Sequence, residues 1–387
     1  MNWLEEGSKY LMPNYARYPI LFEKGEGVYL YDEKGNIYLD MLAGIAVNVL
    51  GYSHPAITKA ICQQAKKLIH TSNLFYIKPQ IELAKILVEN TIKGKVFFCN
   101  SGAEANETAI KLARRYFFTK GENRYEIITF KGGFHGRTLG ALSATFTPEY
   151  QEGFKPLLEG FRYAEFNSID SVLDKVNEKT AGVMIEIVQG EGGINPAKKE
   201  FLQDLQNLCR EKNILLIVDE VQTGIGRTGK LFAFQHFDLN PDIITTAKAL
   251  GGGVPIGAVV AKDNVSSTFS AGTHGSTFGG NYLATEVAKQ VLKIVNQKDF
   301  LEEVSEKGEY FKQKLKETFG FKVKGLGLMI GLELPSHIEA KDIAKESLKK
   351  GLIIGTAGKN TLRFVPPLIV QKNHIDEAVE KLKLIIR

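Results

Sequence analysis

The sequence predicts an α/β protein in which a large domain with a mostly parallel sheet is joined to a smaller α+β domain at the C-terminus. Between about residues 80 and 260, short apolar runs alternate with helical patterns, as they do in successive βαβ units. The runs are almost continuously apolar, which is typical of strands that helices cover on both faces. After about residue 285 the pattern changes to long amphipathic helices and short strands, which indicates a second domain.

The expected elements follow in chain order. The first 50 residues contain two strand-like runs, at residues 27–32 and 37–40, and the turn between them predicts a hairpin. Six apolar runs are the strand candidates of the large domain: residues 96–99, 125–130, 182–186, 214–219, 243–246 and 257–261. The C-terminal region is predicted to hold two helices and two strands, at residues 284–295, 300–319, 329–334 and 361–365. We therefore expect an N-terminal segment that packs with the small domain, a large domain and a small C-terminal domain, at residues 1–50, 51–283 and 284–387.

The composition is that of an ordinary soluble globular protein, with 44% apolar and 24% charged residues among 387. The formal net charge of +5 is spread along the chain, so it does not indicate a nucleic-acid partner. No apolar stretch approaches the roughly 20 residues that span a bilayer. Residues 1–6 carry glutamates where a signal peptide carries basic residues. We therefore expect a cytoplasmic protein with no membrane partner.

Three cysteines, Cys62, Cys99 and Cys209, are far apart in the sequence. Their odd number and their spacing argue against a disulfide framework and against a zinc site. We interpret them as small apolar residues in a reducing compartment, and we expect no metal centre.

Lys248 and Asp219 stand at the ends of two apolar runs. Lys248 follows Ile243–Ala247, where desolvation lowers the pKa of a lysine and frees its neutral amine for Schiff-base chemistry. Asp219 ends the run that begins at Ile214. A lysine to hold an aldehyde and a carboxylate to keep a ring nitrogen protonated suggest a pyridoxal phosphate (PLP) site. Both residues are well placed, because ligands of parallel sheets bind beyond the carboxyl ends of the strands.

Each of these two residues also has a plainer interpretation. Most lysines are solvated surface charges, and most aspartates after a strand cap a turn or a helix. The case for a PLP site therefore depends on other motifs.

A segment of small residues follows the strand predicted at residues 96–99. It contains Ser101, Gly102 and Ala103 and leads into a helical pattern. Small residues at a helix N-terminus let an anion reach the free backbone N–H groups. Ser101 and Glu104 also have the spacing of a capping box, which is compatible with anion binding. The spacing of a P-loop is absent.

Phe134 and Arg137 lie in a glycine-containing segment after the strand predicted at residues 125–130. An aromatic ring flanked by glycines is suited to cover a flat cofactor ring, and an arginine is suited to bind a carboxylate through two N–H groups. The alternative is a turn whose Phe134 packs into the core and whose Arg137 is solvated.

Two further loops and one turn carry polar candidates. Glu191 lies in a glycine-rich turn, where an exposed glutamate is the ordinary expectation. Gln222 stands three residues after Asp219 and is suited to contact a phenolic oxygen of the cofactor. Ser276 and Thr277 lie in a loop of small residues that suits contact with an anion or serves as a domain boundary.

The order of these motifs resembles that of the class III aminotransferases, which use PLP. Along the chain the motifs are Asn-Ser-Gly-Ala-Glu-Ala-Asn, Phe-His-Gly-Arg-Thr, Gln-Gly-Glu-Gly-Gly, Asp-Glu-Val-Gln-Thr-Gly, Ala-Lys-Ala-Leu-Gly-Gly-Gly, Ser-Thr-Phe-Gly-Gly-Asn and Leu-Arg-Phe-Val-Pro-Pro-Leu. They cover nearly the whole chain. The resemblance implies the PLP-dependent transferase fold of type I. Within the family, the sequence most resembles the members that act on N2-acetylornithine.

The resemblance implies a role for each residue of the cofactor site. Lys248 would bind the aldehyde and later move protons at the substrate carbon, and Asp219 would pair with the pyridinium nitrogen. Gln222 would contact the ring oxygen, and Phe134 would stack on the ring. Within one subunit, the phosphate would be held by Ser101, Gly102 and Ala103. Thr277 would reach the phosphate in the other subunit of a homodimer.

The implied activity is transfer of the δ-amino group of N2-acetylornithine to 2-oxoglutarate. The products are N-acetylglutamate 5-semialdehyde and glutamate, and the reaction is a step of arginine biosynthesis. Arg137 would bind the distal carboxylate of the donor, and Arg363 would bind the carboxylate of 2-oxoglutarate beside the reacting carbon. Glu191 would mask Arg363 while the donor is bound, because an unpaired buried charge is costly. Ser276 would touch the donor.

One departure from the family bears on the choice of donor. Ornithine aminotransferases carry a tyrosine near the donor's carboxylate end, and here Ile45 is the match. An apolar side chain suits an acetylated amine better than a free ammonium. The alternatives are ornithine, succinyldiaminopimelate or 4-aminobutyrate as the donor, and an aminomutase on the same scaffold. A PLP-sensing regulator is a further alternative, but the first 50 residues leave no room for its DNA-binding domain.

Overall fold

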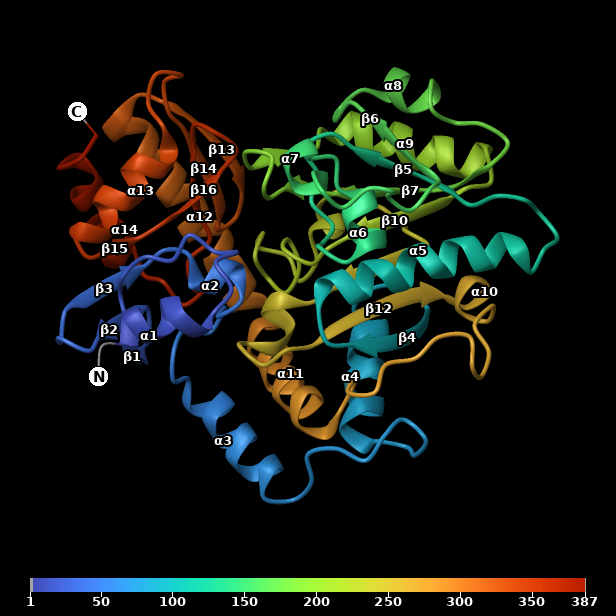
Figure 1. Ribbon diagram of the computed structural model, residues 1–387, viewed down its shortest axis with the longest axis horizontal. Coiled ribbons are helices and arrows are strands. Elements are labelled where there is room, and N and C mark those ends of the chain that lie inside the picture. The colour runs from blue at the N-terminus through green and yellow to red at the C-terminus, as the bar shows by residue number, and fades with distance from the viewer. Residues whose placement is uncertain (1–2, 387) are drawn as a thin grey trace.

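The computed structural model describes residues 3–386, so Met1, Asn2 and Arg387 of the expected N- and C-terminal regions lie outside it. Figure 1 shows two bodies side by side. The larger body is built around a broad sheet, and the smaller one consists of orange and red elements together with the dark-blue N-terminal strands. Within the described residues, no helix has the length and the apolar character needed to cross a membrane.

A seven-stranded sheet forms the centre of the large body. Its strands are β4 (Gly94–Cys99), β5 (Glu126–Phe130), β6 (Phe161–Ala164), β7 (Thr180–Glu186), β10 (Leu215–Asp219), β11 (Ile243–Thr246) and β12 (Gly257–Lys262). Their order is β4-β12-β11-β10-β7-β5-β6. The strands from β11 to β6 run parallel, whereas β12 is antiparallel to both of its neighbours. The mostly parallel sheet predicted from the sequence is therefore confirmed.

The edge strand β6 is the strand of this sheet that the apolar pattern does not predict. It is short, and only Ala164 at its end is buried, while Phe161 and Tyr163 are partly buried and Arg162 is exposed. Arg162 in its middle forms an ion pair with Glu126 of β5. Because an edge strand is covered less than a central one, no continuous apolar run marks it.

Helices cover both faces of the sheet. The longer ones are α3 (Pro55–Ala65), α4 (Lys78–Glu89), α5 (Gly102–Phe118), α9 (Lys199–Glu211) and α11 (Tyr282–Val295). Successive residues of β10 enter two different cores: Leu215 and Ile217 share one with α5, and Leu216 and Val218 share the other with α9 and α11. Figure 1 shows α5 lying across one face of the sheet. This two-sided burial is the reason that the strands are recognisable as apolar runs.

Short elements connect these layers. They are α6 (Leu139–Ala144), α7 (Pro148–Gln151), α8 (Ile169–Leu173), β8 (Val188–Gln189), β9 (Asn195–Pro196), the 3₁₀ helices η1 (Ala233–His236) and η2 (Lys248–Gly251), and α10 (Asp263–Ser266).

The small body has an antiparallel sheet in the order β13-β14-β17-β16. Its elements are α12 (Lys298–Phe319), β13 (Lys322–Leu326), β14 (Met329–Glu333), α13 (Ala340–Lys349), β15 (Leu352–Ile353), β16 (Gly355–Ala357), β17 (Thr361–Phe364) and α14 (Lys372–Lys383). The predicted helix at residues 300–319 and the predicted strands at 329–334 and 361–365 are confirmed.

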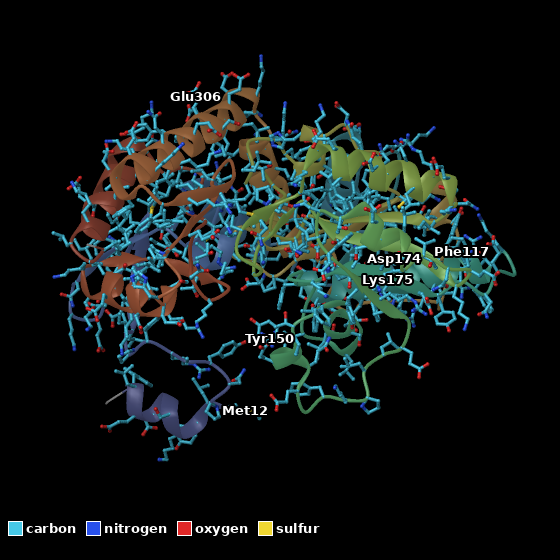
Figure 2. All side chains as sticks on the ribbon, turned by 90° about the horizontal axis from the view of Figure 1, so that it is seen from above. Met12, Phe117, Tyr150, Asp174, Lys175 and Glu306 are labelled. Carbon is cyan, nitrogen blue, oxygen red and sulfur yellow. The ribbon has the colours of Figure 1, made fainter. Side chains whose placement is uncertain are left out.

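The N-terminal elements join this small body. They are β1 (Phe22–Glu26), β2 (Tyr29–Asp32), β3 (Ile37–Asp40) and α2 (Ala43–Ala46). Helix α1 (Trp3–Tyr10) precedes them, buries none of its residues and stands apart from the small body in Figure 2. Strands β2 and β3 form the predicted antiparallel hairpin. Strand β3 then pairs in parallel with β15, where Leu39 is the partner of Leu352, so both ends of the chain contribute to one sheet.

Candidate active site

A cavity of about 230 Å³ lies at the carboxyl ends of β7, β10 and β11, where ligands of a parallel sheet bind. Its walls come from segments that are distant in the sequence, including the start of α5 and the loop after β5. It brings together these residues predicted from the sequence: Gly102, Ala103, Phe134, Arg137, Asp219, Gln222 and Lys248. The rest of the lining consists of Asn106, His135, Gly136, Glu186 and Val221.

Lys248 lines the cavity where β11 has ended and η2 begins. Its backbone has a φ of 41°, a left-handed conformation that costs a non-glycine residue free energy and that is concentrated at functional sites. Burial lowers the pKa of Lys248; Glu191 and Asp219 oppose this shift, and Arg363 adds to it. The amine is therefore neutral more often than that of a solvated lysine, as nucleophilic chemistry requires.

Asp219 is the last residue of β10 and is 3% exposed. Its Oδ2 accepts hydrogen bonds from Asn106 Nδ2 at 2.8 Å and from His135 Nδ1 at 2.8 Å. Its Oδ1 accepts one from the backbone N–H of Val221 at 3.0 Å. These donors fix the orientation of the carboxylate and leave Oδ1 able to accept a further hydrogen bond.

His135 and Glu186 surround Asp219 with further titratable groups. Burial opposes protonation of His135, but the hydrogen bond to Asp219 and the charges of Asp219 and Glu186 outweigh it, so the pKa of His135 is raised. Burial raises the pKa of Glu186 to about 7. Glu186 lies opposite Asp219 in the register of β7 and β10, and it accepts the N–H of Phe134 at 2.9 Å.

Three of these residues, Asn106, His135 and Glu186, were not predicted from the sequence. One of them carried a usable pattern, because Glu186 ends an apolar strand in the same way as Asp219 does. His135 and Asn106 stand inside motifs that were recognised, but nothing in the local sequence shows that they meet at one carboxylate.

The start of α5 has the form of an anion-binding site. Ser101 is the N-cap, and its Oγ accepts the N–H of Glu104 at 3.1 Å. The Glu104 side chain accepts the N–H of Asn100 at 2.7 Å instead of that of Ser101, so half of the predicted capping box forms. Gly102 packs so closely on Val221 that a Cβ would lie 2.6 Å from Cγ1. Ser101 itself is not part of the cavity lining.

Gln222 is buried in the cavity wall. Its Oε1 has no hydrogen-bond partner among the described residues. Gly190 packs against its amide, where a Cβ would lie 2.4 Å from Nε2. A buried polar atom without a partner is costly, so this wall favours a ligand with a polar group.

Arg137 stands at the exposed end of the loop after β5. Its Cζ lies 3.6 Å from the centre of the Tyr150 ring and 5.6 Å from that of Phe134. Phe134 is half-buried and meets Tyr150 edge to face, with 6.2 Å between the ring centres. Because both Phe134 and Arg137 line the cavity, the structure favours the site over a plain turn. Tyr150 belongs to no motif and was missed.

Arg363 and Glu191 form an ion pair beside this cavity. Arg363 lies on β17 of the small body, and its side chain is 6% exposed. Its Nε has no partner among the described residues. Glu191 is 28% exposed and lies on the turn between β8 and β9 of the large body. The predicted pair therefore forms, and it joins the two bodies.

Ser276, Thr277 and Ile45 lie outside the cavity of this single chain. Ser276 Oγ accepts a hydrogen bond from Asn100 Nδ2 at 3.1 Å, which ties its loop to the segment before α5. Thr277 is exposed. Ile45 is also exposed and has a φ of 66°. Their roles remain predictions.

Known proteins resemble this chain over nearly its full length. Residues 10–386 match the family described as Aminotransferase class-III. The chain is 54% identical to the acetylornithine aminotransferase of Aquifex aeolicus, over 97% of this chain and 100% of that one. It is 52% identical to that of Caldanaerobacter subterraneus, over 97% and 96%. A solved ornithine aminotransferase from Toxoplasma gondii, with PLP at partial occupancy in its active site, has a TM-score of 0.94 at 31% identity, covering 98% of this chain and 92% of that one. The chain therefore belongs to the class-III aminotransferase family.

Proposed function

We propose that this enzyme transfers the δ-amino group of N2-acetylornithine to 2-oxoglutarate in the cytoplasm, as a step of arginine biosynthesis. The products are N-acetylglutamate 5-semialdehyde and glutamate. The observation that carries the proposal is the joint placement of Lys248, an exposed Arg137 at the cavity and an Arg363 neutralised by Glu191. The names of the two curated relatives support the same donor.

The enzyme is a PLP-dependent aminotransferase, and the residues present fit this cofactor. The cavity offers a lysine whose pKa burial lowers, a buried carboxylate and the N-terminus of a helix whose first residue, Gly102, packs closely on Val221. The unpaired Oε1 of Gln222 marks a place for a polar group. When bound, PLP takes up the amino group in one half-reaction, releases it in the other and acts as an electron sink between them.

Each side chain has a separate task around the reacting carbon. In one half-reaction the amine of Lys248 takes the proton from that carbon and would pass it to the cofactor, and in the other it delivers a proton to the reacting carbon of the acceptor. Asp219 would hold a proton at the ring nitrogen, and Asn106 and His135 keep its carboxylate in position. Phe134 lines the cavity and would cover a ring face and exclude water from it.

The start of α5 would bind the phosphate. The N–H groups of Gly102 and Ala103 belong to the first turn of α5, where they have no partner within the helix. Ser101 fixes that turn as its cap. The helix dipole adds a favourable field for an anion.

One site has to bind two carboxylates that lie at different distances from the reacting atom. The donor's carboxylate lies several atoms from its reacting amine, whereas that of 2-oxoglutarate lies beside the reacting carbon. Arg137 binds the distal carboxylate, with Ser276 on the donor side. Arg363 binds the proximal one after Glu191 has released it. A side chain as buried as that of Arg363 needs such a partner whenever no ligand is present.

We infer a homodimer in which Thr277 binds the phosphate of the cofactor in the partner subunit. Thr277 is exposed, and the adjacent Phe278 is 60% exposed. Asn73 donates a hydrogen bond to the backbone oxygen of Ser276, the residue before Thr277. In the segment that follows Asn73, Leu74 is 87% exposed and Tyr76 is 94% exposed. Large apolar side chains gathered on one exposed surface are typical of an interface.

We assign PLP binding to a large domain of residues 51–283, with residues 284–387 as the small domain. The N-terminal segment up to residue 50 is assigned to the small domain. The pairing of β3 with β15 supports this assignment.

A panel of donors tests the proposed substrate. The PLP-loaded enzyme is assayed with 2-oxoglutarate and either acetylornithine, ornithine, succinyldiaminopimelate or 4-aminobutyrate. We expect the highest kcat/KM for acetylornithine, and we expect Ile45→Tyr to shift the preference towards ornithine. Equal or better turnover of free ornithine by the unchanged enzyme would reject the proposed donor. Single-turnover transfer of the amino group to 2-oxoglutarate excludes an aminomutase, which needs no external keto acid.

A further inference from the structure

Arg137 is oriented by a tyrosine that lies outside every motif of the sequence. The guanidinium Cζ stands over the Tyr150 ring, 3.6 Å from its centre, which is direct contact with the ring face. Among residues 3–386, no hydrogen bond or ion pair to Arg137 is formed, so contacts with the two aromatic rings are what hold its charged end. Because these ring contacts use none of its N–H groups as hydrogen-bond donors to protein oxygens, the guanidinium keeps them free to bind a carboxylate.

The position of Tyr150 is itself well determined. It lies in the short helix α7, and its N–H donates to the backbone oxygen of Thr147 at 2.9 Å. The next residue, Gln151, is buried, and its Nε2 donates to the backbone oxygens of Leu142 and Thr145. Figure 2 shows Tyr150 on this helix at the margin of the large body. The ring therefore has a fixed support on which Arg137 is placed.

We propose that Tyr150 is a positioning residue for donor specificity, because its ring holds the Arg137 guanidinium in the orientation that accepts the donor's distal carboxylate. This inference rests on the proposed role of Arg137. Phe134 meets the same ring at 6.2 Å, so the tyrosine links the residue that covers the cofactor with the residue that binds the substrate. The effect depends on the aromatic ring and not on the hydroxyl group.

The test compares Tyr150→Leu and Tyr150→Phe in the PLP-loaded enzyme, with kcat and KM measured separately. The donors are acetylornithine and pentylamine, an amine without a carboxylate. We expect Tyr150→Leu to raise the KM for acetylornithine about two- to fivefold with little change in kcat, which is the effect of a partly exposed cation–π contact. Tyr150→Phe should keep the original KM. Pentylamine turnover should be the same in all three proteins, which also shows that the variants are folded.

A double-mutant cycle with Arg137→Leu separates this inference from the proposed function. If Arg137→Leu alone leaves the KM for acetylornithine unchanged, the proposed role of Arg137 is wrong. If Arg137→Leu raises that KM and Tyr150→Leu does not, the inference about Tyr150 alone is wrong. A rise in KM for pentylamine as large as that for acetylornithine would also overturn it. In the Arg137→Leu background, Tyr150→Leu should have no further effect.

A matched control is Tyr31→Leu. This substitution also removes a partly buried tyrosine that stacks with a cation, Lys24 at 5.2 Å, but Tyr31 lies on β2 and does not line the cavity. It should leave the KM for both donors unchanged.

Discussion

At Lys248, backbone strain and an unusual side-chain environment occur in the same residue. Its φ of 41° is unfavourable for a lysine, and two glycines with positive φ follow at Gly252 and Gly253. Such a conformation persists only where the surrounding structure determines it, here the end of β11 and the start of η2. The residue type could be assigned a role from the sequence. The strain could not, because it arises from how the strand meets the loop.

Replacement of Lys248 with alanine is expected to lower kcat by about 10²–10⁴-fold or more, because the proton transfer at the substrate carbon loses its base. The measurement is steady-state turnover of acetylornithine at saturating PLP. Lys262→Ala is the matched control, since it removes another partly buried lysine. Lys262 is the last residue of β12 and forms an ion pair with Asp242. Full turnover by the Lys248→Ala protein would contradict the mechanism.

Glu220 gives a prediction about stability and pH. Burial raises its pKa from 4.5 to about 7, so the folded state favours the protonated form. The stability contributed by the neutral form is fully present below pH 4.5 and is lost as the pH rises through 7. At pH 8 this loss lowers the free energy of unfolding by about 3 kcal/mol. Glu220→Gln keeps an oxygen for the N–H of Phe234 and removes the charge. Its melting temperature should exceed that of the unchanged protein at pH 8, and the difference should shrink towards pH 5. A difference that is the same at both pH values would argue against titration of Glu220.

At the scale of elements, burial decides how much the sequence reveals. Strands such as β7 and β10 are buried along their whole length and were predicted to within two residues. The partly exposed β6 was not predicted. The loops that carry chemistry were found by their motifs, whereas Tyr150 was not, because a single aromatic residue on a short helix has no local pattern. Its partner Arg137 is 13 positions away in the sequence, and the fold alone brings the two together.

The N-cap of α5 gives a prediction at this scale. Ser101→Ala removes the acceptor for the N–H of Glu104 and should lower stability by about 1 kcal/mol. It should also weaken PLP binding, since we propose that the same helix turn binds the phosphate. Ser168 caps α8 through the N–H of Ser171, outside the cavity. Ser168→Ala should lower stability by a similar amount and leave the PLP affinity unchanged. If both variants had the same PLP affinity, the cap of α5 would play no part in binding the phosphate.

At the scale of the whole molecule, the site depends on how the two bodies are held together. The Glu191–Arg363 pair joins them beside the cavity. Arg227 provides a second connection: it is fully buried, and its Nη1 donates to the backbone oxygens of Leu328 at 3.1 Å and Pro366 at 2.6 Å. Burial lowers the pKa of Arg227 to about 9. Because Pro366 lies close to Arg363 in the sequence, this connection also fixes the segment that carries Arg363.

The proposed homodimer predicts that each active site needs residues from both subunits. If Thr277 acts across the interface, each site combines Lys248 of one subunit with Thr277 of the other. A hybrid dimer of Lys248→Ala and Thr277→Val subunits then has one site with both residues and one site with neither. It should show about half the activity of the unchanged dimer, with unchanged PLP affinity at the intact site, whereas the Thr277→Val homodimer should bind PLP more weakly.

If Thr277 acted within its own subunit, the site that retains Lys248 would also carry the Thr277→Val substitution. That site of the hybrid would then bind PLP as weakly as the Thr277→Val homodimer does, so a PLP titration of the purified hybrid distinguishes the two arrangements.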